Sequence, residues 1–321
     1  MLQRLLVALT CILVFTVLPC IDGKIVGGFV MPHGGIALDP NHFNTTNATC
    51  KEQAWEVHRA CIAVGETIQQ LRPDTIFLST PHGIADANNF IFYLNPLAEG
   101  YADTDNCQCP PCCYNISVVV DANFSVNLAS SLAALYNVSG LSAYGPPGQS
   151  SEPFPLRWGE VIPLHFVPEL NRSKVVFLSQ PSRRYTEVVD MITELLKLGA
   201  QLYKSLEARE ERVVVIVSAD LAHTHSTDGP YGYSNASEPF DMACGQWAAS
   251  LDDAALLVEA AQYVSQALSC GYSGMVMLHG MLTAAKDAGS QWTSRLLVNH
   301  HPSYYGMMVA QFLPKTVHKD L

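Results

Sequence analysis

Histidines follow three apolar runs of the sequence, each at the point where the run ends. They are His33 in MPHGG, His82 in TPHGI and His223 in ADLAHTH. Neutral imidazoles bind divalent metals, and an imidazole with a pKa near 6.5 exchanges protons at neutral pH. A lone histidine after a strand is more often a turn or core residue, but three in equivalent positions favour one shared site.

Two of these histidines share the local sequence Pro-His-Gly. In both His33 and His82 the following glycine lets the backbone approach a bound group closely. We expect the two imidazoles to bind one divalent ion, which then needs a third ligand from elsewhere. The candidates by chemistry are Asp220, Asp241, Cys244 and Cys270. His223 would not bind the ion and fits the role of an acid or base.

Short apolar runs predict the strands that position these residues. The expected strands are 24–31, 74–80, 116–120, 161–166, 174–179, 213–218 and 305–312. The expected helices are 51–71, 125–136, 183–208, 251–268 and 274–288. Strands alternating with helices predict a single α/β domain with a largely parallel central sheet and helices on both faces. Because ligands bind at the carboxyl ends of such strands, the three histidines are expected to lie together.

The N-terminus predicts entry into the secretory pathway. Arg4 precedes an apolar run at 5–18, and Pro19 with small or polar residues follows it. This order is typical of a cleavable signal peptide, and the run is shorter than the about 20 residues that span a bilayer. We expect residues 1–23 to be the signal peptide, residues 24–321 to form the mature domain, and no transmembrane segment to remain.

Glycosylation sequons and cysteines support the same interpretation. The sequons begin at Asn44, Asn47, Asn115, Asn123, Asn137, Asn171 and Asn235. The mature chain keeps Cys50, Cys61, Cys107, Cys109, Cys112, Cys113, Cys244 and Cys270. An even number of cysteines in an oxidising compartment favours disulfides. The CQCPPCC cluster at 107–113 is therefore expected to be a disulfide-braced loop rather than a zinc site, and the protein a secreted or lumenal glycoprotein.

The charge balance argues against one class of partner. The chain has 29 acidic and 18 basic residues, a formal net charge of -11, and no long run of Lys or Arg. A nucleic-acid binder needs a basic surface, so nucleic acid is not an expected partner.

The order of several motifs resembles the class III extradiol ring-cleavage dioxygenases, a superfamily that includes the protocatechuate 4,5-dioxygenase β subunit and the Memo proteins. The motifs are the two Pro-His-Gly segments, WGEVIPLHF, SADLAH, and SCGYSGMVMLHGML followed by HPSYYGMMVA. The resemblance covers residues 24–313, and the order of these short motifs carries more weight than any one match. It implies a metal-dependent domain that acts on a catecholic substrate with O2.

The resemblance implies a role for each matching residue. The two metal histidines of the family fall on His33 and His82, and its acid-base histidine falls on His223. The third ligand is a Glu in the dioxygenases, but the matching position here is Cys270, as in Memo-type members. A thiolate is softer than a carboxylate and shifts the preference from Fe(II) towards zinc or copper. In an oxidising compartment Cys270 could instead form a disulfide, for example with Cys244.

A second departure from the family pattern lies just before the expected strand at 161–166. The dioxygenases place another active-site histidine there, whereas this chain has Trp158. His165 could substitute for that histidine if its side chain points into the crevice, although in a strand it could equally pack against neighbours.

Three functions follow from these residues. The leading hypothesis is a secreted oxidoreductase with Fe(II) or another divalent ion on His33 and His82, and with His223 as the base. The alternative is a Memo-like secreted binding or scaffold protein that keeps the fold and a metal but has no dioxygenase activity. A metal-dependent hydrolase is the third. Trp158 and Cys270 favour the alternative, and the three strand-end histidines favour the oxidoreductase.

Overall fold

The computed structural model describes residues 24–149 and 152–315. The expected signal peptide, residues 1–23, lies outside these residues and stays a prediction. Within the described part, no helix is long and apolar enough to cross a membrane.

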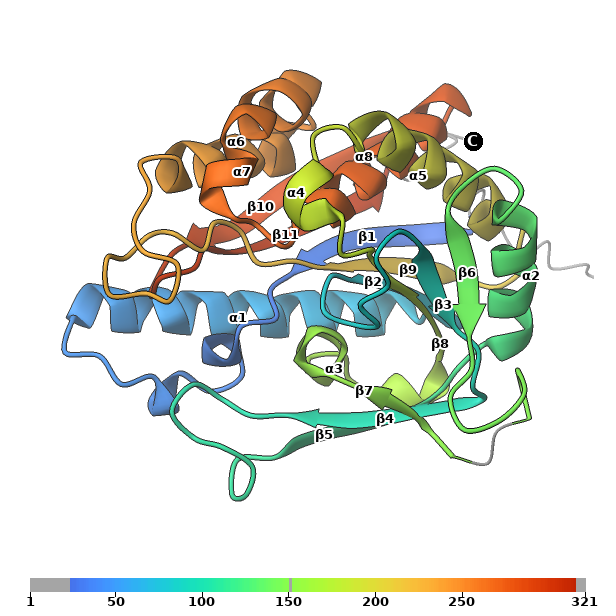
Figure 1. Cartoon of the computed structure of the whole chain (residues 1–321), viewed down its shortest axis with the longest axis horizontal. Helices are drawn as coiled ribbons and strands as arrows, with labels where there is room; N and C mark the ends of the chain where they lie inside the picture. Colours follow the sequence, from blue (N-terminus) through green and yellow to red (C-terminus); the bar gives the residue numbers. More distant parts are fainter. Residues whose placement is uncertain (1–23, 150–151, 316–321) are drawn as a thin grey trace, which may run out of the picture.

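An eight-stranded sheet forms the centre of the domain, in the order β10-β11-β1-β9-β2-β8-β3-β6 (Figure 1). Its strands are β1 (Ile25–Met31), β2 (Thr75–Thr80), β3 (Phe90–Tyr93), β6 (Val138–Leu141), β8 (Lys174–Ser179), β9 (Val213–Ser218), β10 (Trp292–His300) and β11 (Met307–Pro314). The four interior strands β1, β9, β2 and β8 run parallel, while β11 and β3 run antiparallel to their interior neighbours. The predicted α/β class with a largely parallel sheet is confirmed.

A smaller sheet lies on the side of α1 and α3 in Figure 1. It consists of β5 (Tyr114–Val119), β4 (Leu97–Ala102) and β7 (Phe154–Leu156). The run expected at 116–120 is thus a strand, but it belongs to this second sheet. β4 leads directly into the cysteine-rich loop, so the small sheet fixes where that loop begins.

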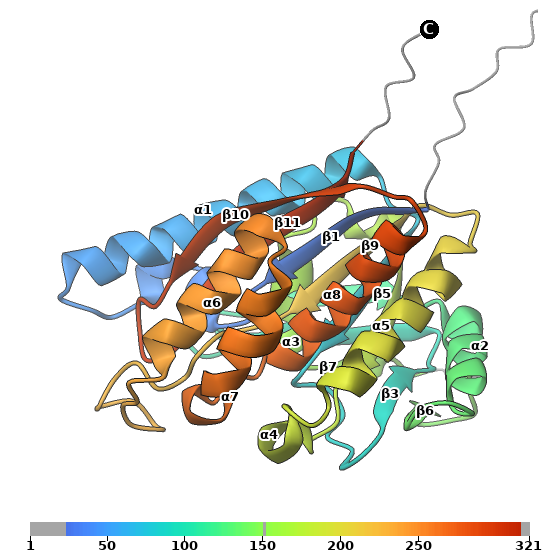
Figure 2. The same cartoon turned by 90° about the horizontal axis from the view of Figure 1, so that it is seen from above.

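Helices cover both faces of the central sheet (Figures 1 and 2). They are α1 (Ala48–Leu71), α2 (Ala122–Leu132), α3 (Trp158–His165), α4 (Arg184–Glu187), α5 (Ile192–Glu207), α6 (Ser237–Ser250), α7 (Ala261–Ala267) and α8 (Tyr272–Asp287). Short 3-10 turns span Gly35–Ala37, Pro40–His42 and Leu170–Arg172, and a π-helical turn spans Ala255–Ala260. One apolar core joins α1 and α3 to the sheet, and a second joins α2, α5, α6, α7 and α8 to its other face.

The longest helix, α1, shows why the sequence folds as it does. The Asn47 side chain accepts hydrogen bonds from two backbone N–H groups of the first turn, at Thr49 and Cys50. A buried stripe then recurs every three or four residues, at Ala54, Val57, Cys61, Val64 and Ile68. The helix ends at Arg72, whose φ of 46° is left-handed, directly before Pro73.

The strand expected at 161–166 is wrong, because this segment belongs to helix α3. The backbone N–H of Arg157 donates to Glu160 Oε2 at 3.0 Å, so a side chain of the first turn satisfies the backbone at the start of the helix. Residues 161–164 are all buried. A segment that is apolar on every side carries no periodicity, so a short buried helix and a buried strand look alike in sequence.

Several further elements were not expected from the sequence, namely β3, β4, β6, β7, β10 and α6. The edge strand β10 is mostly half-buried or exposed, so its sequence lacks the apolar run that marks an interior strand. Helix α6 is also absent from the expected set. Its first turn contains Glu238 and Pro239, and only one face of the helix is apolar.

Candidate metal centre

The three strand-end histidines converge as predicted. His33, His223 and His82 follow β1, β9 and β2, which are adjacent and parallel. The carboxyl ends of these strands therefore meet at one edge of the sheet. All three histidines line one cavity of about 320 Å³ at that edge.

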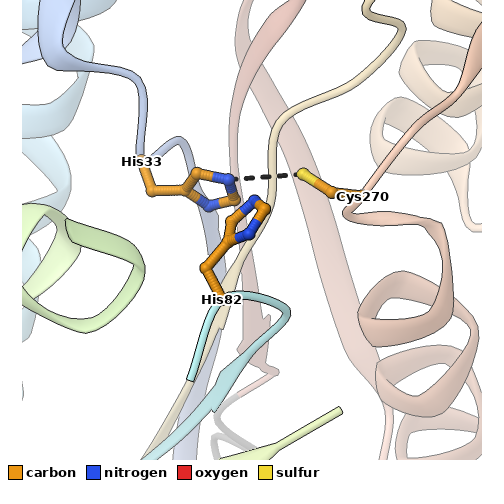
Figure 3. A group of neighbouring side chains, drawn as sticks. All are labelled: His33, His82 and Cys270. Carbon is orange, nitrogen blue, oxygen red and sulfur yellow. Dashed lines mark hydrogen bonds between the residues drawn. The ribbon is translucent and has the colours of Figure 1, made fainter. Parts of the chain in front are cut away.

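His33, His82 and Cys270 lie close together at this edge (Figure 3). The two imidazole centroids are 4.7 Å apart with the rings nearly perpendicular, and Cys270 Sγ lies 3.3 Å from His33 Nε2. One ligand atom from each residue lies within 4.8 Å of the others. Because metal–nitrogen bonds are about 2.0 Å long, this arrangement can hold a single divalent ion.

The other candidates for a third ligand fall elsewhere or play a different part. Asp220 Oδ1 accepts the backbone N–H of His33 at 3.0 Å, and its Oδ2 lies 3.3 Å from His33 Nε2. Asp241 belongs to a separate group, because its Oδ2 is 2.8 Å from His225 Nε2. Cys244 is a buried free thiol on α6, and Cys270 is also free, so the alternative of a Cys244–Cys270 disulfide is wrong.

The cysteine-rich loop does contain disulfides, as predicted. Cys107 is bonded to Cys112, and Cys109 is bonded to Cys113. This loop follows the residues Asp103 and Asp105, which line the cavity. The cluster is therefore a brace for one rim of the site.

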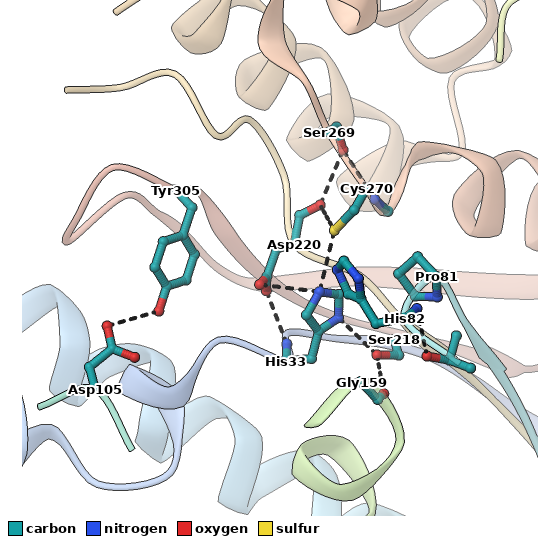
Figure 4. Close-up of polar contacts among 12 residues, drawn as sticks. His33, Pro81, His82, Asp105, Gly159, Ser218, Asp220, Ser269, Cys270 and Tyr305 are labelled. Atoms are coloured by element: carbon teal, nitrogen blue, oxygen red, sulfur yellow. Dashed lines mark hydrogen bonds and ion pairs between the residues drawn. The ribbon is translucent and has the colours of Figure 1, made fainter. Parts of the chain in front are cut away.

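A hydrogen-bond chain sets the orientation and tautomer of His33 (Figure 4). The Ser218 hydroxyl donates to the carbonyl of Gly159, and Ser218 Oγ lies 2.9 Å from His33 Nδ1. Because the serine proton is used, its oxygen accepts from Nδ1–H. That tautomer leaves the lone pair of Nε2 directed at the cluster, as a metal ligand requires.

Burial keeps both imidazoles neutral. It lowers the pKa of His33 to about 3 and that of His82 to about 2, and neighbouring cationic groups such as His223 and Arg184 act in the same direction. Burial, reinforced by Asp220, raises the pKa of the Cys270 thiol. A bound cation would oppose this effect and favour the thiolate. The donor set of two neutral imidazoles and one thiol therefore suits a divalent ion.

His223 lies in the same cavity but outside the cluster. Its Nδ1 is buried without a hydrogen-bond partner among the described residues, and its ring is 6.1 Å from that of Tyr305. Burial lowers its pKa, and the adjacent Asp220 opposes that change. A half-buried imidazole that lines the cavity can exchange a proton with a bound ligand.

The rest of the cavity wall is acidic and aromatic. Its further lining includes Gly34, Gly35, Asp103, Thr104, Asp105, Trp158, Ile162, Asp220, Tyr231, Tyr304 and Tyr305. The Tyr305 hydroxyl donates to Asp105 Oδ2 at 3.4 Å (Figure 4). Burial raises the pKa of Asp105 to about 6. The tyrosines of the HPSYYG motif had no predicted role, and no sequence pattern indicated that Asp105 would line the site.

Trp158 lines the cavity, whereas His165 lies outside it. Trp158 starts α3 and lines the cavity, with its ring 5.2 Å from that of His82. His165 is at the other end of the helix, exposed, with its ring 5.1 Å from that of Tyr114. The expectation that His165 could reach the crevice is therefore not met, since a helix of this length carries it away from the cavity.

The two Pro-His-Gly glycines are needed for close packing of the protein itself. A Cβ at Gly34 would overlap the ring of Tyr305, and a Cβ at Gly83 would overlap the Tyr93 hydroxyl. That hydroxyl donates to Glu160 Oε1 at 2.7 Å. Glu160 is fully buried, and burial raises its pKa to about 7 despite this hydrogen bond. The segments that carry the two histidines are thus packed closely against Tyr305 and Tyr93.

The fold and the site together define an α/β protein with a histidine and cysteine centre at the carboxyl ends of parallel strands. The chain belongs to the family of the catalytic LigB subunit of aromatic ring-opening dioxygenase, whose sequence model matches residues 27–310. Members of this family typically bind a metal and act on aromatic substrates with O2.

Two individual proteins are also similar. An uncharacterized Escherichia coli K12 protein, JW3007, superimposes with a TM-score of 0.50 at 13% identity, over 89% of this chain and 99% of that one, which shows the fold alone. Protein CA_C1420 of Clostridium acetobutylicum is 36% identical over 84 residues. That match spans 26% of this chain and 16% of the bacterial protein.

Proposed function

We propose that the chain is a metal-dependent oxidoreductase that opens the ring of a catecholic substrate with O2. The observation that carries this proposal is the His33, His82 and Cys270 cluster, whose two histidines line the same cavity as His223. The family supports the ring-opening class, while the catechol and the metal are our inference.

The residues would divide the work as follows. His33, His82 and Cys270 would hold the ion, which supplies Lewis acidity and, if it is iron, a redox-active centre. His223, which lines the cavity, would accept a proton from a catechol hydroxyl. Both atoms of O2 enter the ring-opened product, so the reaction needs no outside reductant.

The decisive experiment is metal analysis of the glycosylated protein, followed by anaerobic loading with Fe(II). Oxygen uptake and the absorbance of ring-opened products are then measured over a panel of catechols. Uptake of one O2 per catechol consumed supports the proposal. Stoichiometric metal with no uptake on any catechol would overturn it.

Two residues favour a second candidate, a secreted binding or scaffold protein. Cys270 stands where the dioxygenases have a carboxylate, and its buried thiol is free to bind a soft ion. Trp158 fills the place of a histidine beside His82. Two results together would favour this candidate: tight binding of zinc or copper without turnover of any catechol, and no gain of oxygen uptake in the Trp158→His variant.

We also propose that the protein is exported and N-glycosylated. The asparagines of all seven sequons are exposed. They are Asn44, Asn47, Asn115, Asn123, Asn137, Asn171 and Asn235. The disulfides of the loop at 107–113 are compatible with an oxidising compartment.

A further inference from the structure

A second group of residues with metal-binding side chains lies apart from the first cluster. It consists of His225, Asp241 and His301, and one ligand atom from each lies within 4.8 Å of the others. We call these three residues the outer group. His225 lies in the segment after β9, Asp241 lies on α6, and His301 directly follows β10. Three separate elements therefore bring the outer group together.

Two members of the outer group are buried and already paired. The side chains of His225 and Asp241 are 5% and 6% exposed, and His225 Nε2 lies 2.8 Å from Asp241 Oδ2. The other oxygen, Asp241 Oδ1, accepts the backbone N–H of Ala222 at 2.9 Å. A Cβ at Gly306 would overlap the carboxylate, so Asp241 has little room to turn away. The imidazole and the carboxylate are thus two donors held in fixed positions.

His301 completes the outer group from the solvent side. Its ring is stacked on that of His225, with the centroids 4.0 Å apart and an angle of 1° between the planes. Its side chain is 42% exposed, and its Nδ1 lies 3.7 Å from Glu238 Oε2. Glu238 precedes Asp241 by three residues on α6, so both carboxyl groups lie on one face of the helix. Two imidazoles and two carboxyl groups therefore meet here, which is a donor set that zinc binds.

The stacked rings need one movement to bind an ion. A metal ion meets an imidazole nitrogen in the plane of the ring, and a tetrahedral ion with bonds of about 2.0–2.1 Å keeps its ligand atoms about 3.3 Å apart. Two parallel rings cannot both point at one ion, so one of them must tilt. The exposed His301 has room to do so, whereas His225 is buried. The ion would replace the proton between His225 Nε2 and Asp241 Oδ2, and binding would release that proton.

The outer group lies where two walls of the cavity are joined. The segment after β9 carries His223, and the loop between β10 and β11 carries Tyr304 and Tyr305. The backbone N–H of His225 donates to the carbonyl of Tyr304 at 3.1 Å, and further backbone hydrogen bonds join the same two segments. An ion held by His225 and His301 would add a cross-link between these segments. It would fix the position of the acid-base histidine relative to the tyrosines beside it.

We propose that His225, Asp241 and His301 form a second divalent-metal site, a structural zinc site that clamps the two cavity walls together. Glu238, whose exposed carboxylate lies beside His301, supplies the fourth ligand that structural zinc sites use. The site has nitrogen and oxygen donors and no thiol, unlike the cluster that contains Cys270. This inference does not rest on the proposed function, because it concerns other ligands and needs no substrate.

The test uses the untagged, glycosylated protein with the substitution His33→Ala, which removes a ligand of the first cluster, so that zinc bound tightly is held elsewhere. The metal-free chain is titrated with zinc in competition with a chromogenic chelator. We expect one zinc per chain, and adding His301→Ala should weaken its binding by roughly tenfold or more because a ligand is lost. His300→Ala is the matched control, since His300 is the neighbouring residue but pairs with Glu56. Its zinc affinity should equal that of the parent chain.

Amide hydrogen exchange tests the clamp itself. Zinc should slow exchange at residues 221–225 and 303–306 in the His33→Ala chain, because an ion that joins the two segments opposes their local opening. The same addition should change nothing once His301→Ala is present. Zinc binding without slower exchange in either segment would overturn the clamp.

Two results of the titration would overturn the site. One is that the His33→Ala chain binds no zinc, and the other is that His301→Ala leaves the affinity unchanged. Should His33→Ala or His301→Ala not fold, Cys270→Ala and Glu238→Gln replace them with the same expectations. None of these results bears on ring opening, which the oxygen-uptake assay decides separately.

Discussion

Cys270 Sγ lies 3.3 Å from His33 Nε2, although the two residues are 237 positions apart in the chain. β1 delivers the imidazole, and the segment before α8 delivers the thiol. Both donors are buried, and each lacks a charge in the absence of a cation, because burial lowers the histidine pKa and raises the cysteine pKa. The two uncharged donor atoms are therefore close enough together to bind one divalent ion.

The first prediction separates metal binding from acid-base chemistry. His33→Ala should lose the metal and the activity together, because two remaining protein ligands hold a divalent ion poorly. His223→Ala should keep the metal and lower turnover by roughly 10²- to 10⁴-fold. Metal content and oxygen uptake of the two variants check this. Loss of metal from His223→Ala would show that this histidine is a ligand.

The second prediction concerns the softness of the site. Cys270→Ala should lower the affinity for zinc or copper by more than tenfold, because the thiolate ligand is removed. Cys244→Ala is the matched control, since Cys244 is equally buried and free but lies outside the cluster. Competition with a chromogenic chelator measures both affinities. Equal affinities in the two variants would exclude Cys270 as a ligand.

The third prediction is a pH dependence of stability from Glu160. Its pKa in the folded protein is about 7, above the usual 4.5, because the carboxyl is buried. The stability from the protonated form is fully present below pH 4.5 and is lost as the pH rises through about 7, at a cost of up to roughly 3 kcal/mol.

The matched variant for this effect is Glu160→Gln, which keeps a neutral group of the same shape beside Tyr93. Urea unfolding from pH 4.5 to 8 should show a decline in wild-type stability relative to the variant. Taking the difference removes the titration of the histidines, which both proteins share. Parallel curves would mean that Glu160 is ionised in the folded protein at neutral pH.

The fourth prediction concerns maturation. The secreted chain should begin between Ile21 and Lys24 and should lose mass on treatment with an N-glycosidase. Intact mass spectrometry decides both points, and a retained Met1 or an unchanged mass would reject export through the signal peptide. Alkylation after denaturation without reductant should label Cys270 but none of the four loop cysteines between 107 and 113.

The parallel interior of the sheet could be predicted because its strands are buried on both faces and therefore read as unbroken apolar runs. His33, His82 and Cys270 could be found because they follow such runs or match the order of family motifs. Helix α3 could not be recognised, since its residues 159–164 are all buried and therefore show no period.

The burial of Arg184 could not be predicted from the sequence for a different reason. Its hydrogen bonds go to the carbonyl oxygens of Pro81 and Pro181, and the first of these lies 103 positions away in the chain. Backbone partners have no residue type that a sequence can display. In the sequence Arg184 is only the second of two adjacent arginines.

The disulfide-braced loop has a consequence for how firmly the binding cavity holds its shape. Asp103 and Asp105 occupy the few positions between the end of β4 and the first bonded cysteine, Cys107. Without the two bridges, this stretch is held at its two ends by the pairing of β4 with β5, where Ala102 faces Tyr114, so the acidic rim is less firmly fixed. The imidazole and thiol donors, in contrast, stand on the central sheet and need no bridge. Oxidation of the loop thus tightens the acidic rim of the chamber, whereas the ion-binding end of the sheet does not depend on it.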